Sequence, residues 1–472
     1  MAMHPIRILG RAAAQGLGHM LAGIALLASS AAGLAATTPA TSTPTWQENP
    51  YPSTYKPYPG EPTAIIGATV FDGTGGEIAN GTVLLRDGKI IAVGDARLAV
   101  PDGYKRIDGT GKFVTPGVID IHSHLGVYAS PGVSAHSDGN EATSPTTPQV
   151  WAEHSVWPQD PGFSRALTNG GVTSMQILPG SANLIGGRSV VLKNVYARTA
   201  QAMKFPGAPY GMKMACGENP KRVYGDRNQM PSTRMGNLAV DRQEWIKAAE
   251  YRKKRADGKL DERDLAMETM ADVLDGKILV QNHCYRADEM AQVIDMAKEF
   301  GYKVTAFHHA VEAYKIGDLL KANGICAAIW ADWWGFKMEA FDGIPENAAL
   351  LADAGACVII HSDDANGIQR LNQEAAKARA AGRRMGIDIS DGQVIRWITL
   401  NPATALGIDK QTGSLAPGKM GDAVLWNGNP LSVYSRPEKV WVDGALLFDS
   451  ADPKRRPVSD FELGLPGEGD VK

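Results

Sequence analysis

Two histidines separated by one residue, His122 and His124, stand at the end of an apolar run in this sequence. Alternate side chains of a β-strand point to the same side, so both imidazoles would face one site if the run is a strand. Neutral imidazole binds zinc and related divalent ions well, and two ligands on one rigid strand make half of a metal site. The pair therefore predicts metal binding, although two structural histidines beside a turn would give the same pattern.

Other candidate ligands also stand where apolar runs end: His283, the pair His308 and His309, and the pair Asp363 and Asp364. Short runs rich in branched and aromatic residues, separated by helix-length segments, are typical of buried parallel strands in βαβ units. Because the carboxyl ends of parallel strands meet at one edge of a sheet, we expect these side chains to lie together.

The spacing of the apolar runs predicts an α/β fold. Eight runs can be counted from His122 onward: 116–122, 171–178, 188–193, 211–216, 277–282, 302–307, 325–330 and 356–361. Eight strand and helix units fit a (β/α)8 TIM barrel, here residues 116–405, whose chemistry lies at the carboxyl ends of its parallel strands. All the candidate ligands fall at those ends.

Longer motifs carry a resemblance to a known family. The stretch from Val114 to His124, together with the later His, His and Asp, resembles the metal-dependent amidohydrolase superfamily and, within it, the imidazolonepropionase-like group. Further similar stretches are 178–187, 212–225, 332–334, 401–403 and 413–419. The resemblance covers about residues 61–450. It implies an enzyme that hydrolyses a carbon–nitrogen bond of a small molecule.

The resemblance also implies a set of metal ligands. His122, His124 and Asp363 would bind one divalent ion, and His283 and His309 would bind a second. Zinc is the expected metal, and Asp363 would also be the catalytic base. His308 falls where relatives often carry Glu, which favours a role as partner of a ligand.

An anionic group should bridge the two ions. Many imidazolonepropionase-like relatives use a carboxylated lysine at the end of the fourth strand, and Lys213 is the nearest lysine. We expect Glu218 instead, because it needs no modification and Lys213 looks out of register. A turn or helix-start acid is the structural alternative for Glu218.

Candidate substrate contacts are Asn183, Arg222, Tyr224, His308 and Trp333. Arginine matches the geometry of a carboxylate, and the tryptophan could wall the pocket, although solvated charges and a buried aromatic core are competing accounts. Residues 126–163 form a long segment after the first strand, which is either a binding loop or a surface insertion.

The flanking segments are expected to be structural. Residues 61–115 and 406–452 contain short alternating runs around the turns Asp87-Gly88 and Asp443-Gly444, which indicate hairpins. In the resembled superfamily the two ends of the chain form one small β-sandwich beside the barrel. The remaining 453–472 would be a tail.

The N-terminus has the pattern of a secretory signal. Arg7 and Arg11 precede the apolar stretch 17–34, and Ala35 and Ala36 follow it, so we expect cleavage near residue 36 and a linker over 37–60. The mature protein would be periplasmic or secreted and free of the membrane; a membrane anchor is the alternative. We expect the four cysteines to be buried thiols, with no disulfide pairing assigned: Cys216, Cys284, Cys326 and Cys357.

Composition is that of a soluble globular protein, with 44% hydrophobic and 21% charged residues and a net charge of −3. The sequence has no basic stripe of the kind that binding to a nucleic-acid backbone needs, so the expected partner is a small molecule. Self-association into a homo-oligomer is left open. The predicted function is hydrolysis of an amide, dipeptide-like or cyclic amide bond. Three alternatives stay open: a mononuclear deaminase, a lactonase or esterase, and a non-catalytic relative.

Overall fold

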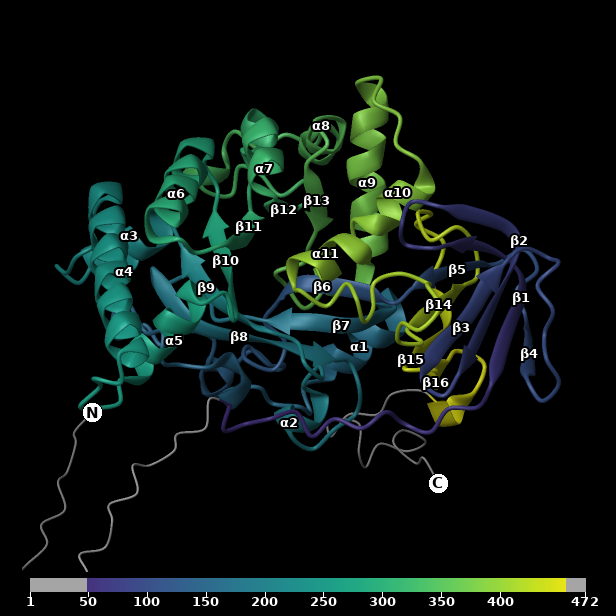
Figure 1. The fold of residues 1–472 in the computed structure, drawn as a ribbon. Helices are drawn as coiled ribbons and strands as arrows, with labels where there is room; N and C mark the ends of the chain where they lie inside the picture. Colours follow the sequence, from purple (N-terminus) through teal and green to yellow (C-terminus); the bar gives the residue numbers. More distant parts are fainter. Residues whose placement is uncertain (1–48, 456–472) are drawn as a thin grey trace, which may run out of the picture. The chain divides into compact units, whose positions relative to one another are not determined.

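The strands that carry the candidate ligands belong to one eight-stranded sheet of the computed structural model, which describes residues 49–455 (Figure 1). Its hydrogen-bonded order is β13-β12-β11-β10-β9-β8-β7-β6. Asp363 N, just after β13, donates to His122 O of β6 at 3.0 Å and so closes the sheet into a barrel. Every predicted run overlaps one strand: β6 (Val118–Ser123), β7 (Val172–Ile177), β8 (Ile185–Lys193), β9 (Tyr210–Ala215), β10 (Ile278–Cys284), β11 (Val304–His309), β12 (Cys326–Ile329) and β13 (Cys357–Ile360).

The expectation of eight parallel strands is wrong for the third. β8 pairs antiparallel with both β7 and β9. The reason is the connection 178–184 before β8, which contains no helix and is too short for the crossover that a parallel neighbour requires. The chain therefore turns back directly, and this connection lies at the same end of the barrel as the candidate ligands, where Leu178 O accepts a hydrogen bond from His124.

Helices occupy most of the other connections and lie around the strands (Figure 1). Asp160 shows how one begins: its carboxylate accepts from Gly162 N at the start of the first helix. The helices are α1 (Pro161–Gly170), α2 (Ala200–Met203), α3 (Glu218–Gly225), α4 (Arg234–Ala256), α5 (Leu265–Leu274), α6 (Ala287–Phe300), α7 (Gly317–Asn323), α8 (Asn347–Asp353), α9 (Leu371–Arg384), α10 (Asp391–Arg396) and α11 (Leu400–Ala405).

Strands from both flanks of the barrel share a second sheet, in the order β16-β15-β14-β5-β1-β2-β3, with β4 paired to β1. Asp87, Gly88, Asp443 and Gly444 all have positive φ, as the two tight hairpin turns require. The strands are β1 (Thr63–Phe71), β2 (Glu77–Arg86), β3 (Lys89–Gly94), β4 (Lys105–Asp108), β5 (Phe113–Pro116), β14 (Ala423–Trp426), β15 (Pro437–Val442) and β16 (Ala445–Asp449).

The expected signal segment 1–36 and most of the tail 453–472 lie outside the described residues. The described part of the linker, up to residue 60, has neither helix nor strand, as expected from its composition. Within residues 49–455, no helix combines the length and the apolar character needed to cross a membrane.

The expectation of buried thiols is also wrong, because all four cysteines form disulfides. Cys216 is joined to Cys284 with a Cα–Cα distance of 5.2 Å, and Cys326 to Cys357 with 4.4 Å. The strands explain the pairing. Cys326 and Cys357 are register partners in β12 and β13, and the other pair lies at the ends of neighbouring β9 and β10, which brings each pair within bridging distance.

A buried charged cluster connects the barrel to the second sheet. Lys193 of β8 is fully buried, with Nζ 2.9 Å from both carboxylate oxygens of Asp422 and 3.3 Å from Asp443 Oδ2. Tyr55, in the extended N-terminal segment, donates its hydroxyl to Asp443. One ammonium therefore compensates two buried carboxylates from segments far apart in sequence.

We predict that Lys193→Met destabilises the fold by about 3–5 kcal/mol, since removal of one partner leaves buried charge uncompensated. Urea unfolding followed by circular dichroism measures the change. Lys105→Met is the control because Lys105 pairs with Glu61 at the surface and should hardly alter the midpoint. Equal midpoints for both variants would contradict a stabilising role of the cluster.

Candidate metal centre

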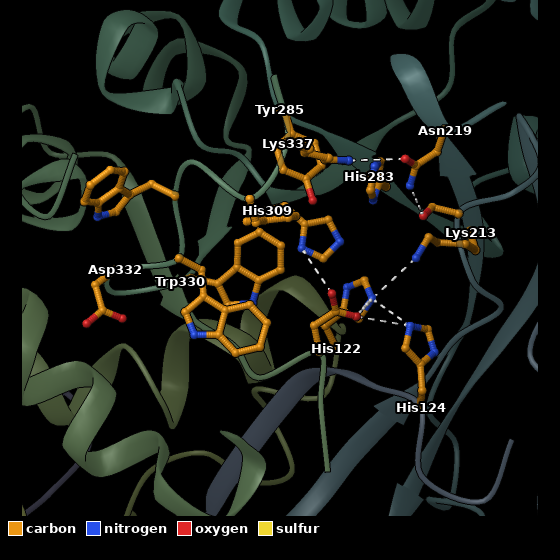
Figure 2. A pocket seen from close by; sticks show the side chains of 15 residues that line it. His122, His124, Lys213, Asn219, His283, Tyr285, His309, Trp330, Asp332 and Lys337 are labelled. Carbon is orange, nitrogen blue, oxygen red and sulfur yellow. Dashed lines mark hydrogen bonds and ion pairs between the residues drawn. The ribbon is translucent and has the colours of Figure 1, made fainter. Parts of the chain in front are cut away.

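A cavity of about 620 Å³ opens at the carboxyl ends of the barrel strands. Figure 2 shows that His122 and His124 lie on one side, His309 lies near the centre, and Lys337 and Asn219 lie on the other side. The structure brings these predicted site residues together around it: His122, His124, Lys213, His283, His309, Trp333 and Asp363.

Three of the expected ligands form one tight group. Asp363 Oδ1 lies 3.3 Å from His122 Nε2 and 3.2 Å from His124 Nε2, and the two ring nitrogens are 3.3 Å apart. This is the set that the resemblance assigned to one ion. Its donor chemistry, two imidazoles and a carboxylate, suits zinc.

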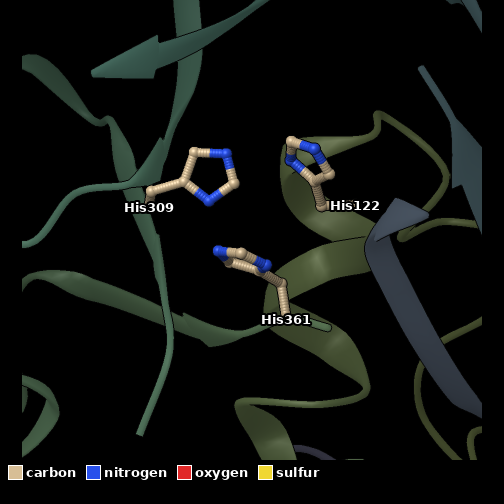
Figure 3. Close-up of side chains that lie close together, drawn as sticks. All are labelled: His122, His309 and His361. Carbon is tan, nitrogen blue, oxygen red and sulfur yellow. The ribbon is translucent and has the colours of Figure 1, made fainter. Parts of the chain in front are cut away.

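A second group shares His122 and adds His309 and His361, and one ring nitrogen of each lies within 4.8 Å of the others (Figure 3). His283 is the expected partner of His309 at the second ion. The ring centroids of the two histidines are 4.6 Å apart. Both ring nitrogens of His283 and of His361 are buried with no hydrogen-bond partner among residues 49–455. Buried imidazole nitrogens are normally satisfied, so these side chains fit a divalent ion as the missing partner.

Burial sets the protonation of the histidines. It lowers the pKa of His122, His283 and His309 well below the ordinary value and that of His361 to about 3. All four are therefore neutral at pH 7, as metal ligation requires. Burial alone would raise the pKa of Asp363, but interactions with His309 and His124 outweigh it and lower that pKa below its usual value.

A hydrogen-bonded relay fixes the tautomer of His122. Gln281 Nε2 donates to Thr305 and Ala405, so Gln281 Oε1 is an acceptor and His308 Nε2, 2.7 Å away, must donate to it. Neutral His308 then accepts at Nδ1 from His122 Nδ1, also at 2.7 Å. The lone pair of His122 Nε2 is thereby directed at the ligand group. His308 thus contacts the candidate ligand His122, in line with the predicted role as partner of a ligand. It does not line the cavity, where a substrate contact would have to lie.

Asp120 holds the first and last strands of the barrel together beside the ligands. Its buried carboxylate accepts from His122 N at 3.1 Å, from Ser362 N at 3.3 Å and from the Ser362 hydroxyl. Burial raises the pKa of Asp120 to about 7, although these hydrogen bonds favour the carboxylate. The contact fixes the peptides next to His122 and Asp363.

Two candidate ligands occupy left-handed backbone. His309 has φ of 70° and Asp363 has φ of 65°, a region that only a few per cent of residues other than Gly adopt. Each follows or ends its strand, at the point where the chain leaves the barrel. Such conformations persist where the surrounding structure enforces them, often at functional sites.

The two candidates for the bridging group occupy different places. Lys213 is 1% exposed, and its Nζ lies 3.5 Å from His122 Nε2, inside the ligand group. Burial lowers the pKa of Lys213 to about 8. Glu218 instead begins α3 and has its carboxylate 3.6 Å from Lys337 Nζ. Sequence register had favoured Glu218, whereas in the structure the side chain of Lys213 points into the ligand group and that of Glu218 points toward Lys337.

Most of the expected substrate contacts lie outside the cavity. Tyr224 is buried and donates to Ser144 O and Asn183 Oδ1, while Asn183 donates to Glu141 O and Thr147. These bonds fasten the long loop after β6 to α3. Arg222 is exposed and does not line the cavity, whereas Trp333 does.

Sequence reasoning missed several residues that line or support the site, chiefly His361, Tyr285, Trp330 and Lys337. A signal for His361 was present, since His361-Ser362-Asp363 repeats the spacing of His122-Ser123-His124 at a strand end. Lys337 had no such signal. It comes from an irregular segment after β12, and only the folded loop carries it into the cavity.

Comparisons with known proteins agree with this geometry. The profile of the amidohydrolase family matches residues 243–447. The chain is similar to amidohydrolase tasK of Hapsidospora irregularis, with 33% identity over 433 residues, 83% of this chain and 43% of that relative. It is also similar to imidazolonepropionase of Mesorhizobium japonicum, with 23% identity over 76% of this chain and 90% of the relative.

A solved structure gives the same result. The crystal structure of an amidohydrolase from Thermotoga maritima is 38% identical, with a TM-score of 0.75, and the match covers 82% of this chain and all of that one. Identity at this level over the complete length of a relative establishes common family membership. The chain therefore belongs to the metal-dependent amidohydrolase superfamily, as its strand-end motifs indicated.

Proposed function

We propose that this protein hydrolyses the carbon–nitrogen bond of a small amide, dipeptide-like or cyclic amide substrate with two bound zinc ions. The observation that carries the proposal is the convergence of four histidines, Asp363 and Lys213 on one cavity. His122, His124 and Asp363 would hold one ion, and His283 and His309 the other. When bound, such ions acidify water and polarise a carbonyl.

Asp363 would move the proton. Its side chain is 25% exposed and lines the cavity, and interactions with His309 and His124 favour its ionised form. Hydrolysis forms a carbon–oxygen bond and breaks the carbon–nitrogen bond. Asp363 would accept the proton of the attacking water and return it to the leaving nitrogen, which departs as a neutral amine.

For the bridging group we propose a carboxylated Lys213 in place of Glu218. The amine of Lys213 is already within the ligand group, whereas the carboxylate of Glu218 faces Lys337. Addition of carbon dioxide to the neutral amine forms a nitrogen–carbon bond and releases one proton. The resulting carbamate would bring two oxygen ligands and a negative charge to a position lined by neutral imidazoles.

The metal-loaded protein should release amine product from a panel of N-acyl amino acids, dipeptides and cyclic amides. Asp363→Asn should lower kcat by roughly 10²- to 10⁴-fold while most metal is retained, because the amide cannot accept a proton. Asp295→Asn on the exposed face of α6 is the control. Ammonia as the sole product would indicate a deaminase, and hydrolysis of lactones or esters alone would indicate an esterase; either result would contradict the proposal.

Lys213→Ala should lose metal and activity, and bicarbonate should accelerate reactivation of the metal-free wild-type protein but not of the variant. Glu218→Gln should retain both metal ions. Elemental analysis measures the metal content of each protein. Native mass spectrometry should detect carboxylation as a mass increase of the wild type. Loss of metal in Glu218→Gln, with full metal in Lys213→Ala, would restore Glu218 as the bridge.

We also propose export to the periplasm or the medium, with removal of about the first 36 residues. The N-terminal pattern carries this proposal, and two disulfides suit an oxidising compartment. Mass spectrometry of protein from its native host should find a mature chain starting near Ala36, located outside the cytoplasm. A cytoplasmic species that retains Met1 would refute export.

A further inference from the structure

The half of the cavity opposite His122 and His124 contains one ammonium group. Lys337 Nζ donates to Asn219 Oδ1 at 3.2 Å and lies 3.9 Å from the centroid of the Tyr285 ring (Figure 2). Its side chain is 17% exposed. The aromatic ring and the amide oxygen therefore fix a positive charge in a partly dehydrated position, where it interacts more strongly with an anion than it would in water.

The neighbouring carboxylates do not occupy the hydrogen-bond donors of the Lys337 ammonium. Glu218 and Glu339 approach Nζ to 3.6 and 4.0 Å, beyond normal hydrogen-bond distance. Glu339 is engaged by Arg234, which also pairs with Glu289 at 3.0 Å. An ammonium has three donors, and within residues 49–455 Asn219 is its acceptor at hydrogen-bond distance. Donors thus remain for a ligand in the cavity.

The position of Lys337 limits where the ligand's anion can be. The Tyr285 ring beneath it lies 4.9 Å from the ring of His283 and 5.5 Å from that of His309. One side chain therefore separates the ammonium from the expected ligands. An anion only two bonds from the scissile nitrogen, such as the α-carboxylate of an amino acid, suits this short separation better than one at the end of a long chain.

Aromatic side chains line the path from the ligands to the mouth of the cavity. Trp330 stacks on His309 with 4.4 Å between centroids, and Trp333 stacks on Trp330 at 5.2 Å. Trp333, Trp334 and Phe336 are 37%, 55% and 56% exposed. Exposed aromatics clustered at a cavity mouth are typical of a surface that binds an apolar group.

On the basis of the proposed hydrolase function, we propose that Lys337, positioned by Asn219, binds the α-carboxylate of the leaving amino acid, and that Trp333, Trp334 and Phe336 contact its large apolar side chain. The substrate class is then an N-acylated aromatic or large aliphatic amino acid, including a dipeptide with such a residue at its C-terminus. Neutral amides of the same size would be poor substrates.

The test compares N-acetylphenylalanine with N-acetylphenylalaninamide, in which a neutral amide replaces the charged α-carboxylate. The wild type should prefer the acid at least tenfold in kcat/KM. Lys337→Met should raise KM for the acid roughly ten- to hundredfold, as expected for one lost charged hydrogen bond, and remove the preference. Lys337→Arg should restore most of it. Lys298→Met on the outer face of α6 is the matched control and should behave as wild type.

A binding measurement separates this inference from the proposed function. Tryptophan fluorescence should report binding of L-phenylalanine to the wild type but much weaker binding to Lys337→Met, whereas L-phenylalaninol should bind weakly to both. If this binding pattern is found but no substrate is hydrolysed, the proposed carboxylate site stands and the proposed hydrolase function is rejected. Hydrolysis of both substrates with equal efficiency, or an equal loss on both in folded Lys337→Met, would reject the carboxylate site and retain the hydrolase.

Discussion

Closure of the barrel between β6 and β13 is the constraint on which the site depends. The two strands come from opposite ends of the barrel sequence, yet each supplies ligands to the same group. Asp120 joins them by accepting from the backbone N–H of His122 in β6 and from the backbone N–H and hydroxyl of Ser362 just after β13, and a backbone hydrogen bond from Asp363 to His122 completes the contact. Without this junction, the two halves of the ligand group would have no fixed spacing.

The site concentrates polar groups that are costly to bury, and each has a compensating arrangement. The relay from Gln281 through His308 satisfies His122 on the side away from the cavity and leaves its other nitrogen as a lone-pair donor. The unsatisfied nitrogens of His283 and His361 have no such arrangement, which suits side chains whose partner is an ion.

The cavity has two chemically different halves. The inner half contains imidazoles and one carboxylate on rigid strand ends, and the outer half contains an ammonium and aromatic rings on the segment after β12. Reactive groups on strands are held precisely by the sheet, whereas a loop can vary without disturbing it. This division explains how the family chemistry and the substrate preference can be set by separate parts of one chain.

The sequence by itself determined the α/β class, the position of every barrel strand and the residues His122, His124, His283, His309 and Asp363. These follow from local patterns, namely apolar runs and the polar residues at their ends. The antiparallel β8, the disulfides and the place of Lys213 were decided only by tertiary structure, because they depend on which strands become neighbours and on which side chains of a strand face the barrel interior. Lys337 reaches the cavity through an irregular loop, whose path no periodic pattern encodes.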